Sequence, residues 1–408
     1  MQILSLNSLA ARWSACWRAA LFGTSVAALT AVSLVACGGG GEAPGTAGTA
    51  TAQSFASGPI TGLGSIIVNG VRFDDSAARV ENEEDGSVRG ARDLRLGMMV
   101  EVESGRIDDG AARAVAGVIR FGSELVGPVA SIDAAASTLR VLDQTIEVKS
   151  TTVFEEGLAG FGAIAVGQVL EIHAQFDAVS GRYMATRIER EDGASVFRLR
   201  GLVAALDTAA KTFRIGDAVI NYGSVAAATL PNLADGQRVR VRLQTAQLNN
   251  QWVALTVRSG VRRVDDFGDA RLRGLITAFS SALQFEVQGI PVDASTANFD
   301  PGPAAVVLGA LVEVRGTAAG GKIIATRVKV RDERDDDLRR VELHGTASAL
   351  NSAAKTFLLR EITVDYSRVL EWKNGAPTDL ANGRQLEVKG LWSTDRRTLV
   401  AVVIEFES

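Results

Sequence analysis

The chain has 408 residues, of which 47% are hydrophobic and 22% are charged, and its formal net charge is −4. This composition is typical of globular proteins. The slightly acidic balance argues against a general nucleic-acid binder, whose affinity comes largely from neutralising phosphates. Aromatic residues make up only 6% of the chain, which leaves few stacking platforms for bases. We therefore expect no nucleic-acid partner.

Residues 1–36 have the organisation of an export signal. Arg12 and Arg18 precede an apolar stretch over 19–35, and a small residue, Ala36, stands directly before Cys37. A basic start, an apolar core and a small residue before the cut are typical of a secretory signal peptide. The apolar stretch, about seventeen residues long, is also short for a membrane span. We expect residues 1–36 to be removed.

The sequence Leu-Val-Ala-Cys over 34–37 resembles the lipobox of bacterial lipoproteins. The resemblance implies that Cys37 takes a diacylglycerol, that the peptide is cut before it, and that the new amine is acylated. Several acyl chains anchor a protein stably, whereas one chain binds only marginally. Residue 38 is Gly rather than Asp, which by resemblance to enterobacterial sorting implies the outer membrane. The Gly/Ala/Thr-rich segment 37–57 is expected to be a flexible tether.

The chain contains two cysteines, Cys16 and Cys37. The proposed processing would remove Cys16 and acylate Cys37. No thiol would then remain for disulfide, redox or metal chemistry, and we expect no cofactor.

Short motifs recur in order along the rest of the chain. The sequence RLRGL occurs at 198–202 and again at 271–275, and AAKTF occurs at 209–213 and again at 353–357. Self-similarity of this kind indicates a repeat architecture. Each unit begins with a short strand that contains a glycine, in order Gly62, Gly127, Gly201, Gly274 and Gly345. We expect five repeats, numbered 1 to 5, over residues 58–121, 122–194, 195–264, 265–334 and 335–408.

Each repeat continues with an alternating apolar run, a less regular stretch, a turn that ends in glycine, a fourth strand and a last hairpin. Strict alternation predicts strands with one buried and one solvated face. Asn69-Gly70 between apolar flanks predicts a hairpin. A glycine inside the first strand is typical of a bulge or a bend at a barrel corner.

These features predict an all-β chain, a tandem array of about five small five-stranded antiparallel β-barrels. A bent first strand and a long link between the third and fourth strands match the oligonucleotide/oligosaccharide-binding (OB) barrel. A small barrel of another topology stays open as an alternative.

Four segments of repeat 1 are similar to a bacterial family named domain of unknown function 5666. They are GPITG at 58–62, VNGVRF at 68–73, DLRLG at 93–97 and VEV at 100–102. The resemblance extends from about residue 58 to residue 405, with looser motifs in the middle repeats. That family occurs in tandem in exported proteobacterial proteins, and it implies the architecture without implying an activity.

Side chains with catalytic or metal-binding potential are few. His173 and His344 occupy non-equivalent positions in their repeats and have no Cys or His neighbour at ligand spacing. We interpret both as structural or surface residues and expect no metal site and no catalytic residue. Paired acids of a glycosidase need not be close in sequence, so an enzyme acting on glycans stays open.

Two acidic segments are interpreted as solvent-exposed. One is polar and lies beside Gly86, and its acids are Glu81, Glu83, Glu84 and Asp85. The other is the run Asp332–Asp337, which lacks the alternate ligand positions and central glycine of a calcium loop. A charged linker is favoured for this run, and calcium binding stays open.

Arg238, Arg240 and Arg242 alternate along one predicted strand, so all three project from the same face. Arg198 and Arg200 lie in the first strand of the same repeat. The stripe could bind anions such as lipid phosphates or acidic glycans. The favoured interpretation is a solvated strand face whose arginines pair with nearby acids.

Together these features predict a non-enzymatic lipoprotein of the bacterial cell envelope, anchored in the membrane through its N-terminal lipid. Its barrels would serve binding or envelope structure. Expected partners are an acidic glycan, lipopolysaccharide or another envelope protein. An envelope enzyme acting on glycans and a spacer that holds something away from the membrane are the alternatives.

Overall fold

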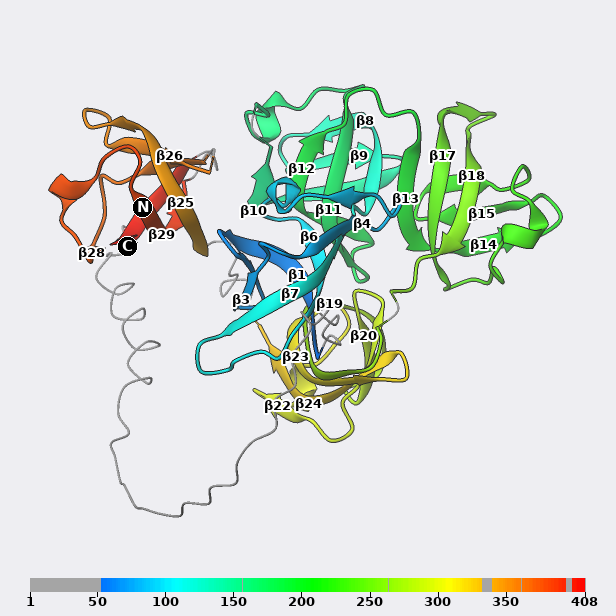
Figure 1. The fold of residues 1–408 in the computed structure, drawn as a ribbon. Helices are drawn as coiled ribbons and strands as arrows, with labels where there is room; N and C mark the ends of the chain where they lie inside the picture. Colours follow the sequence, from blue (N-terminus) through cyan, green and yellow to red (C-terminus); the bar gives the residue numbers. More distant parts are fainter. Residues whose placement is uncertain are drawn as a thin grey trace, which may run out of the picture. The chain divides into compact units, whose positions relative to one another are not determined.

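The computed structural model describes residues 53–155, 157–262, 264–331, 340–360, 362–393 and 398–407. Within these ranges the chain is all-β, and its helices are single 3-10 turns (Figure 1). No helix in these ranges is long and apolar enough to cross a membrane. The expected signal peptide, Cys37, nearly all of the expected tether and the acidic run 332–337 lie outside them.

Repeat 1 is a closed barrel. Its first strand pairs with the second, the second with the third, the third with the fifth, the fifth with the fourth, and the fourth with the first. All of these pairs are antiparallel except that of the third and fifth strands. The five strands are β1 (Ser54–Leu63), β2 (Ile66–Val68), β3 (Val71–Asp74), β6 (Met99–Ser104) and β7 (Arg113–Phe121). Two short strands, β4 (Arg79–Asn82) and β5 (Val88–Arg89), lie in the link before the fourth strand.

Repeats 2 and 3 have the same strand order. In repeat 2 the strands are β8 (Leu125–Asp133), β9 (Thr138–Val141), β10 (Gln144–Phe154), β11 (Val169–Asp177) and β12 (Arg182–Arg190). In repeat 3 the first strand is interrupted at Val203. Its strands are β13 (Phe197–Leu202), β14 (Ala204–Asp207), β15 (Thr212–Ile215), β16 (Ala218–Asn221), β17 (Arg238–Leu248) and β18 (Gln251–Ser259).

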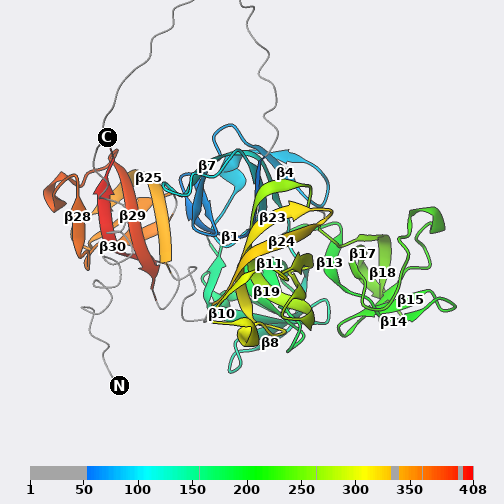
Figure 2. The same ribbon diagram turned by 90° about the horizontal axis from the view of Figure 1, so that it is seen from below.

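Repeats 4 and 5 again close in this order, with one extra short strand each, β22 and β28 (Figure 1). Figure 2 shows β28 beside β30, with which it pairs. Repeat 4 consists of β19 (Phe267–Ser281), β20 (Gln284–Val287), β21 (Ile290–Asp293), β22 (Asn298–Asp300), β23 (Leu311–Ala319) and β24 (Lys322–Val330). Repeat 5 consists of β25 (Arg340–Asn351), β26 (Thr356–Leu359), β27 (Ile362–Asp365), β28 (Glu371–Lys373), β29 (Gln385–Trp392) and β30 (Thr398–Phe406). The predicted tandem array of small OB-like barrels is confirmed, but the barrels are not wholly antiparallel as expected, because the third and fifth strands of each ring pair in parallel.

The second and third strands are joined by two-residue hairpin turns. Both turn residues have positive φ at Asn69-Gly70, Leu142-Asp143 and Gln288-Gly289. This is the geometry of a type I′ turn, which matches the twist of the flanking strands. Only the first of these turns has the Asn-Gly sequence that identifies it without a structure.

The repeated AAKTF motif forms the turn between the first and second strands. In repeat 3, Asp207 Oδ1 accepts hydrogen bonds from the backbone N–H groups of Ala209 and Ala210, at 2.9 and 2.8 Å. Lys211 then takes a positive φ of 58°, and Lys355 in the second copy takes 57°. The phenylalanine that ends each copy, Phe213 or Phe357, is buried in its core. The motif therefore recurs for structural reasons.

The glycine shared by the first strands is Gly58 in repeat 1, not Gly62. The register places Gly58 opposite Val100, just as Gly127 lies opposite Leu170 and Gly201 opposite Val239. The expected bulge does not explain this glycine. The hairpin turn packs so closely that a Cβ at Gly127 would lie 2.5 Å from Leu142 Cγ. The register shift of the first strand comes later, between Val129 and Ser131.

First strands also join neighbouring repeats. The beginning of β1 pairs in parallel with β19, and its end pairs in parallel with β25. The first strands β8 and β13 pair antiparallel instead, with Val126 opposite Arg198. The strand β1 begins at Ser54, inside the segment expected to be tether, because residues 54–57 pair with both β6 and β19.

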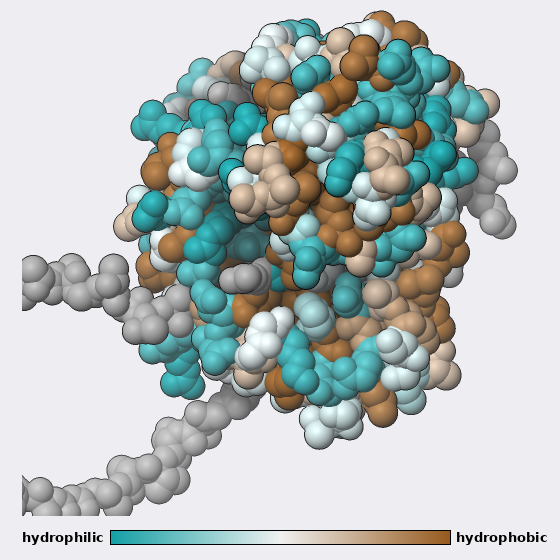
Figure 3. All heavy atoms as spheres, turned by 90° about the vertical axis from the view of Figure 1, so that its right-hand side faces the viewer, coloured by the Kyte–Doolittle hydropathy of each residue, from teal (hydrophilic) through white to brown (hydrophobic). Residues whose placement is uncertain are grey.

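The surface of the molecule exposes large apolar side chains as well as polar ones. The face shown in Figure 3 has hydrophilic and hydrophobic residues interspersed. Large exposed apolar side chains such as Val88, Val166 and Leu248 come from different repeats. Scattered apolar residues of this kind are normal on a protein surface.

We predict that Gly201→Ala destabilises the protein by about 1–3 kcal/mol, because overpacking forces side chains to shift. The added Cβ would lie 2.3 Å from Ile215 Cγ2 and 3.0 Å from the Tyr183 hydroxyl oxygen. Urea unfolding measures the effect. Gly162→Ala is the matched control, because a Cβ there meets no atom within 4 Å. Equal stability of the two variants would contradict the close-approach explanation.

Candidate functional site

The first and fourth strands of each barrel lie side by side and present one outer face, called here the 1–4 face. On this face, the first-strand residue that precedes the shared glycine lies opposite one residue of the fourth strand. The two residues on either side of that fourth-strand residue point into the core. These pairs are Ser57–Glu101, Val126–Glu171, Arg200–Arg240, Arg273–Glu313 and His344–Glu387. The barrel is thus kept constant while the side chains on this face change between repeats.

In repeat 3 the 1–4 face includes the predicted arginine stripe. Its exposure is graded: Arg238 is buried, Arg240 is half-buried and Arg242 is exposed. Arg240 lies opposite Arg200, and Arg242 lies opposite Arg198. The solvated face expected from alternation is therefore present only at the Arg242 end.

Carboxylates from other repeats neutralise Arg240 and the buried Arg200 opposite it. Glu83 lies 2.8 Å from Arg200 and 3.1 Å from Arg240, and Glu84 lies 3.6 Å from Arg240. Glu124 of repeat 2 lies 3.5 Å from Arg200. Glu83 is thus part of a network of ion pairs, which differs from the solvated loop expected at 81–85.

Arg262 extends this network. It lies 3.4 Å from Glu124 and 3.4 Å from Glu101, and its side chain is 6% exposed. Burial raises the pKa of Glu101 in spite of Arg262. Burial would also raise the pKa of Glu83, but the charges of Arg200, Arg262 and Arg240 outweigh it and lower that pKa to about 2. The network joins repeats 1, 2 and 3.

Arg238 is the most buried member of the stripe, and burial lowers the pKa of its guanidinium. Its Nε has no hydrogen-bond partner among the described residues. Arg242, at the other end, forms no ion pair within the part of the chain that the structure describes. The stripe is therefore a contact surface between repeats over most of its length.

We predict that Glu83→Gln lowers stability at pH 7 by about 3 kcal/mol, because it leaves buried arginines without their carboxylate. The folded pKa of Glu83 lies below its ordinary value of 4.5, so ionised Glu83 stabilises the fold above that pH. This contribution is lost as the pH falls toward 2. The difference in unfolding temperature between Glu83→Gln and the wild type should therefore become smaller as the pH falls over this range.

Glu371→Gln is the matched control for this prediction, because Glu371 is exposed on β28. A Glu83→Gln penalty that does not change with pH would contradict the role of the ionised carboxylate.

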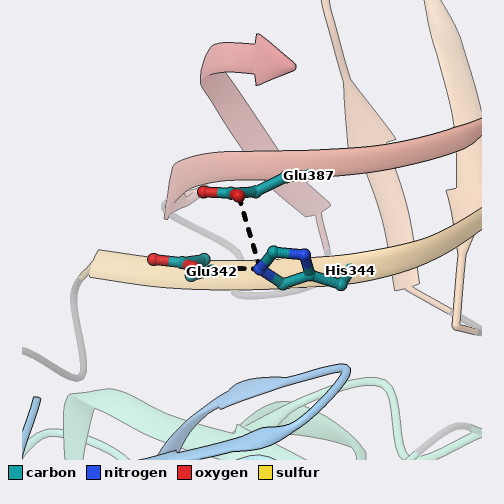
Figure 4. Close-up of side chains that lie close together, drawn as sticks. All are labelled: Glu342, His344 and Glu387. Carbon is teal, nitrogen blue, oxygen red and sulfur yellow. Dashed lines mark hydrogen bonds and ion pairs between the residues drawn. The ribbon is translucent and has the colours of Figure 1, made fainter. Parts of the chain in front are cut away.

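The 1–4 face of repeat 5 gathers a histidine and several glutamates (Figure 4). Glu342 and His344 come from β25 and Glu387 from β29. His344 Nε2 lies 2.9 Å from Glu342 Oε1 and 3.6 Å from Glu387 Oε2. His344 Nδ1 lies 2.7 Å from Glu407 Oε1. Both ring nitrogens therefore face carboxylate oxygens.

Two cations lie against the same carboxylates. Lys389 Nζ lies 2.5 Å from Glu387 Oε1 and 3.7 Å from Glu342 Oε2. Arg72 of repeat 1 forms an ion pair with Glu342 and lies 3.9 Å from Glu387. Burial would raise the pKa of Glu342, but the hydrogen bond with His344 and the charges of Lys389 and Arg72 lower it. The cluster is close to electrical balance.

Glu342, His344 and Glu387 could hold a divalent metal ion, since their ligand atoms lie within 4.8 Å of one another. An imidazole and two carboxylates are suitable ligands for zinc. The ammonium of Lys389 and the guanidinium of Arg72 already contact these oxygens, however, and a metal ion would have to displace them. The arrangement favours an ion-pair cluster.

Sequence spacing missed this cluster. Glu342 and His344 are two residues apart, so they share a strand face. Glu387 is 43 positions beyond His344 and joins them only through the register that pairs these two residues. The sequence identified the fourth strand by its motif, which resembles Val-Glu-Val. It did not identify the first-strand residue that lies opposite the central glutamate.

We predict that Zn²⁺ does not shift the thermal unfolding of the wild-type protein and that Lys389→Met creates a zinc-dependent increase. Removing the ammonium would leave the Arg72 guanidinium as the cation that a metal ion still has to displace from Glu342 and Glu387. Calorimetric titration with Zn²⁺ provides a second measurement. Lys355→Met, at an exposed lysine, is the control. Tight zinc binding by the wild type would contradict the ion-pair interpretation.

His173 lies apart from these clusters. Its side chain is 1% exposed, and Nδ1–H donates a hydrogen bond to the Gly122 carbonyl oxygen at 3.1 Å. Burial lowers the pKa of this imidazole. These contacts are those of a structural histidine, as the sequence led us to expect.

Comparison with known proteins finds a family similar to three segments of the chain. Residues 126–189, 273–329 and 344–405 match the family described as Domain of unknown function (DUF5666). A search of curated proteins found no match. Among solved structures, the Drosophila Unr CSD456 chain is 14% identical over 51% of this chain and 97% of its own length, with a TM-score of 0.13. A TM-score this low carries no argument about fold or function.

Proposed function

We propose that this chain, with its tandem barrels of the DUF5666 kind, is a lipid-anchored, non-enzymatic protein of the bacterial cell envelope. Its barrels bind partners or act as spacers. The anchor is the lipid on Cys37, and the favoured location is the outer membrane. Partners of matching chemistry are an acidic glycan, lipopolysaccharide or another envelope protein.

One observation carries the proposal for the barrels. The backbone ring is the same in each repeat, while the charged residues of the 1–4 face differ. In repeat 3 this face contacts other barrels through ion pairs such as Glu83–Arg200. A surface that recognises a barrel of its own chain by charge complementarity is suited to recognise others.

The alternative is an envelope enzyme acting on glycans. Repeat 5 favours it most, because it places Glu342, Glu387 and His344 together. A glycosidase, however, needs one carboxyl group with a raised pKa as its general acid. The pKa of Glu342 is lowered, and Lys389 lies 2.5 Å from Glu387. These contacts support the non-enzymatic function.

We predict that the wild-type chain is labelled when cells are grown with a palmitate analogue and that Cys37→Ala abolishes the label. The thiol of Cys37 is the proposed site of lipid attachment. Gel fluorescence after coupling of the analogue to a dye measures the result. Cys16→Ala is the matched control, because Cys16 would be removed with the signal peptide. Label that persists in Cys37→Ala would refute the anchor.

A further inference from the structure

A cavity of about 380 Å³ lies among loops and strand ends of repeats 1, 2 and 5. Its size is within the range of sites for small molecules. Its walls combine apolar and charged side chains from separate parts of the chain. The apolar lining includes Leu63, Leu96, Phe154, Leu158, Ile362 and Trp392.

Three arginines line the same cavity: Arg95, Arg187 and Arg360. Arg187 has a carboxylate partner, since it lies 2.7 Å from Glu189. Among the lining residues that the structure describes, Glu155 is the acid, and it is also paired, at 2.8 Å from Arg190. These described residues include more arginines than acids.

Arg95 and Arg360 hydrogen-bond to backbone carbonyls. Arg360 Nε donates to the His344 oxygen at 2.6 Å, and Arg95 donates to the Leu94 oxygen at 3.2 Å and to that of Arg92. Neither forms an ion pair within the ranges that the structure describes. These carbonyls orient the two guanidinium groups without neutralising their charge.

The stripe of repeat 3 provides the comparison. There Arg200 and Arg240 face Glu83, Glu84 and Glu124, so their charge is compensated within the chain. At the cavity Arg95 and Arg360 form no ion pair among the described residues, and their charges act only from beyond ion-pair distance on the carboxylates of Glu189 and Asp75. A guanidinium group binds carboxylate and phosphate in a planar, two-bond geometry. Apolar neighbours strengthen such a bond where they exclude water, as at the half-buried Arg95.

We infer that this cavity binds a small organic anion, a carboxylate or phosphate group attached to an apolar body. Arg95 and Arg360 bind the anionic group, and Trp392, Leu96 and Leu158 contact the apolar body. The inference rests on the proposed binding function and specifies a ligand class for it.

The test uses calorimetric titration of the full chain in non-ionic detergent. The probes are 2-naphthoate and 2-naphthyl phosphate, with acetate and inorganic phosphate as anions that lack the apolar body. A naphthylmethylammonium ion is the cationic control. Both naphthyl anions should bind, and the cation should not. Stronger binding of one naphthyl anion identifies the anionic group as carboxylate or phosphate.

Arg95→Gln and Arg360→Gln should each weaken binding of the naphthyl anions about tenfold or more, because each removes a charge-assisted hydrogen bond. Arg368→Gln, at an exposed arginine that does not line the cavity, should bind like the wild type. Unchanged thermal unfolding verifies that each variant is folded. Using two single variants keeps the test decisive if one of them is unstable.

Three results would overturn the inference: no binding by the wild type, equal binding of the cation, or folded cavity variants that bind like the wild type. Equal binding of acetate or inorganic phosphate would overturn the requirement for an apolar body. Palmitate labelling of the same variants separates this site from the anchor. If the variants keep the palmitate label and bind the naphthyl anions like the wild type, the proposed anion site is refuted and the proposed lipid anchor is not.

Discussion

The pairing of the first strand with the fourth is the constraint on which the molecule depends. It closes each ring of strands and so removes the exposed edges of five adjacent small sheets. It also sets the register that places Arg200 opposite Arg240 and His344 opposite Glu387. The glycine in the first strand protects this closure, because it leaves room for the hairpin turn that packs over it. The pairing of the first and fourth strands thus determines both the closure of the barrel and which side chains lie together on its surface.

Charge burial explains how the repeats contact one another. Removing Arg200 and Arg262 from water is unfavourable, and the side chains of both are 6% exposed or less. Glu83, Glu101 and Glu124 offset that desolvation only when repeats 1, 2 and 3 are together. An ion network of this kind adds specificity more than stability, because an incorrect arrangement would leave unpaired charges buried. The same reasoning applies to the cluster of Lys389 with Glu342 and Glu387 in repeat 5.

Arginines have two different roles in this chain, and their neighbours determine which. In repeat 3, Arg240 of the stripe and Arg200 opposite it are compensated by glutamates of repeats 1 and 2. Arg95 and Arg360 line the cavity and, among the described groups, donate hydrogen bonds only to carbonyl oxygens. The presence of an arginine therefore does not by itself identify an anion site. The distance from the arginine to the nearest carboxylate is the better guide, because a close carboxylate occupies the guanidinium that a ligand would need.

The sequence by itself determined the class of fold, since alternation, turn residues and recurring motifs are local patterns. It predicted the barrels and the hairpin at Asn69-Gly70, and it singled out the stripe at 238–242. It misassigned Gly62 and the solvated loop around Glu83, and it could not pair His344 with Glu387. Those facts depend on register and on contacts between repeats. Only the tertiary structure decided them, because burial and charge compensation are set by residues that are distant along the chain.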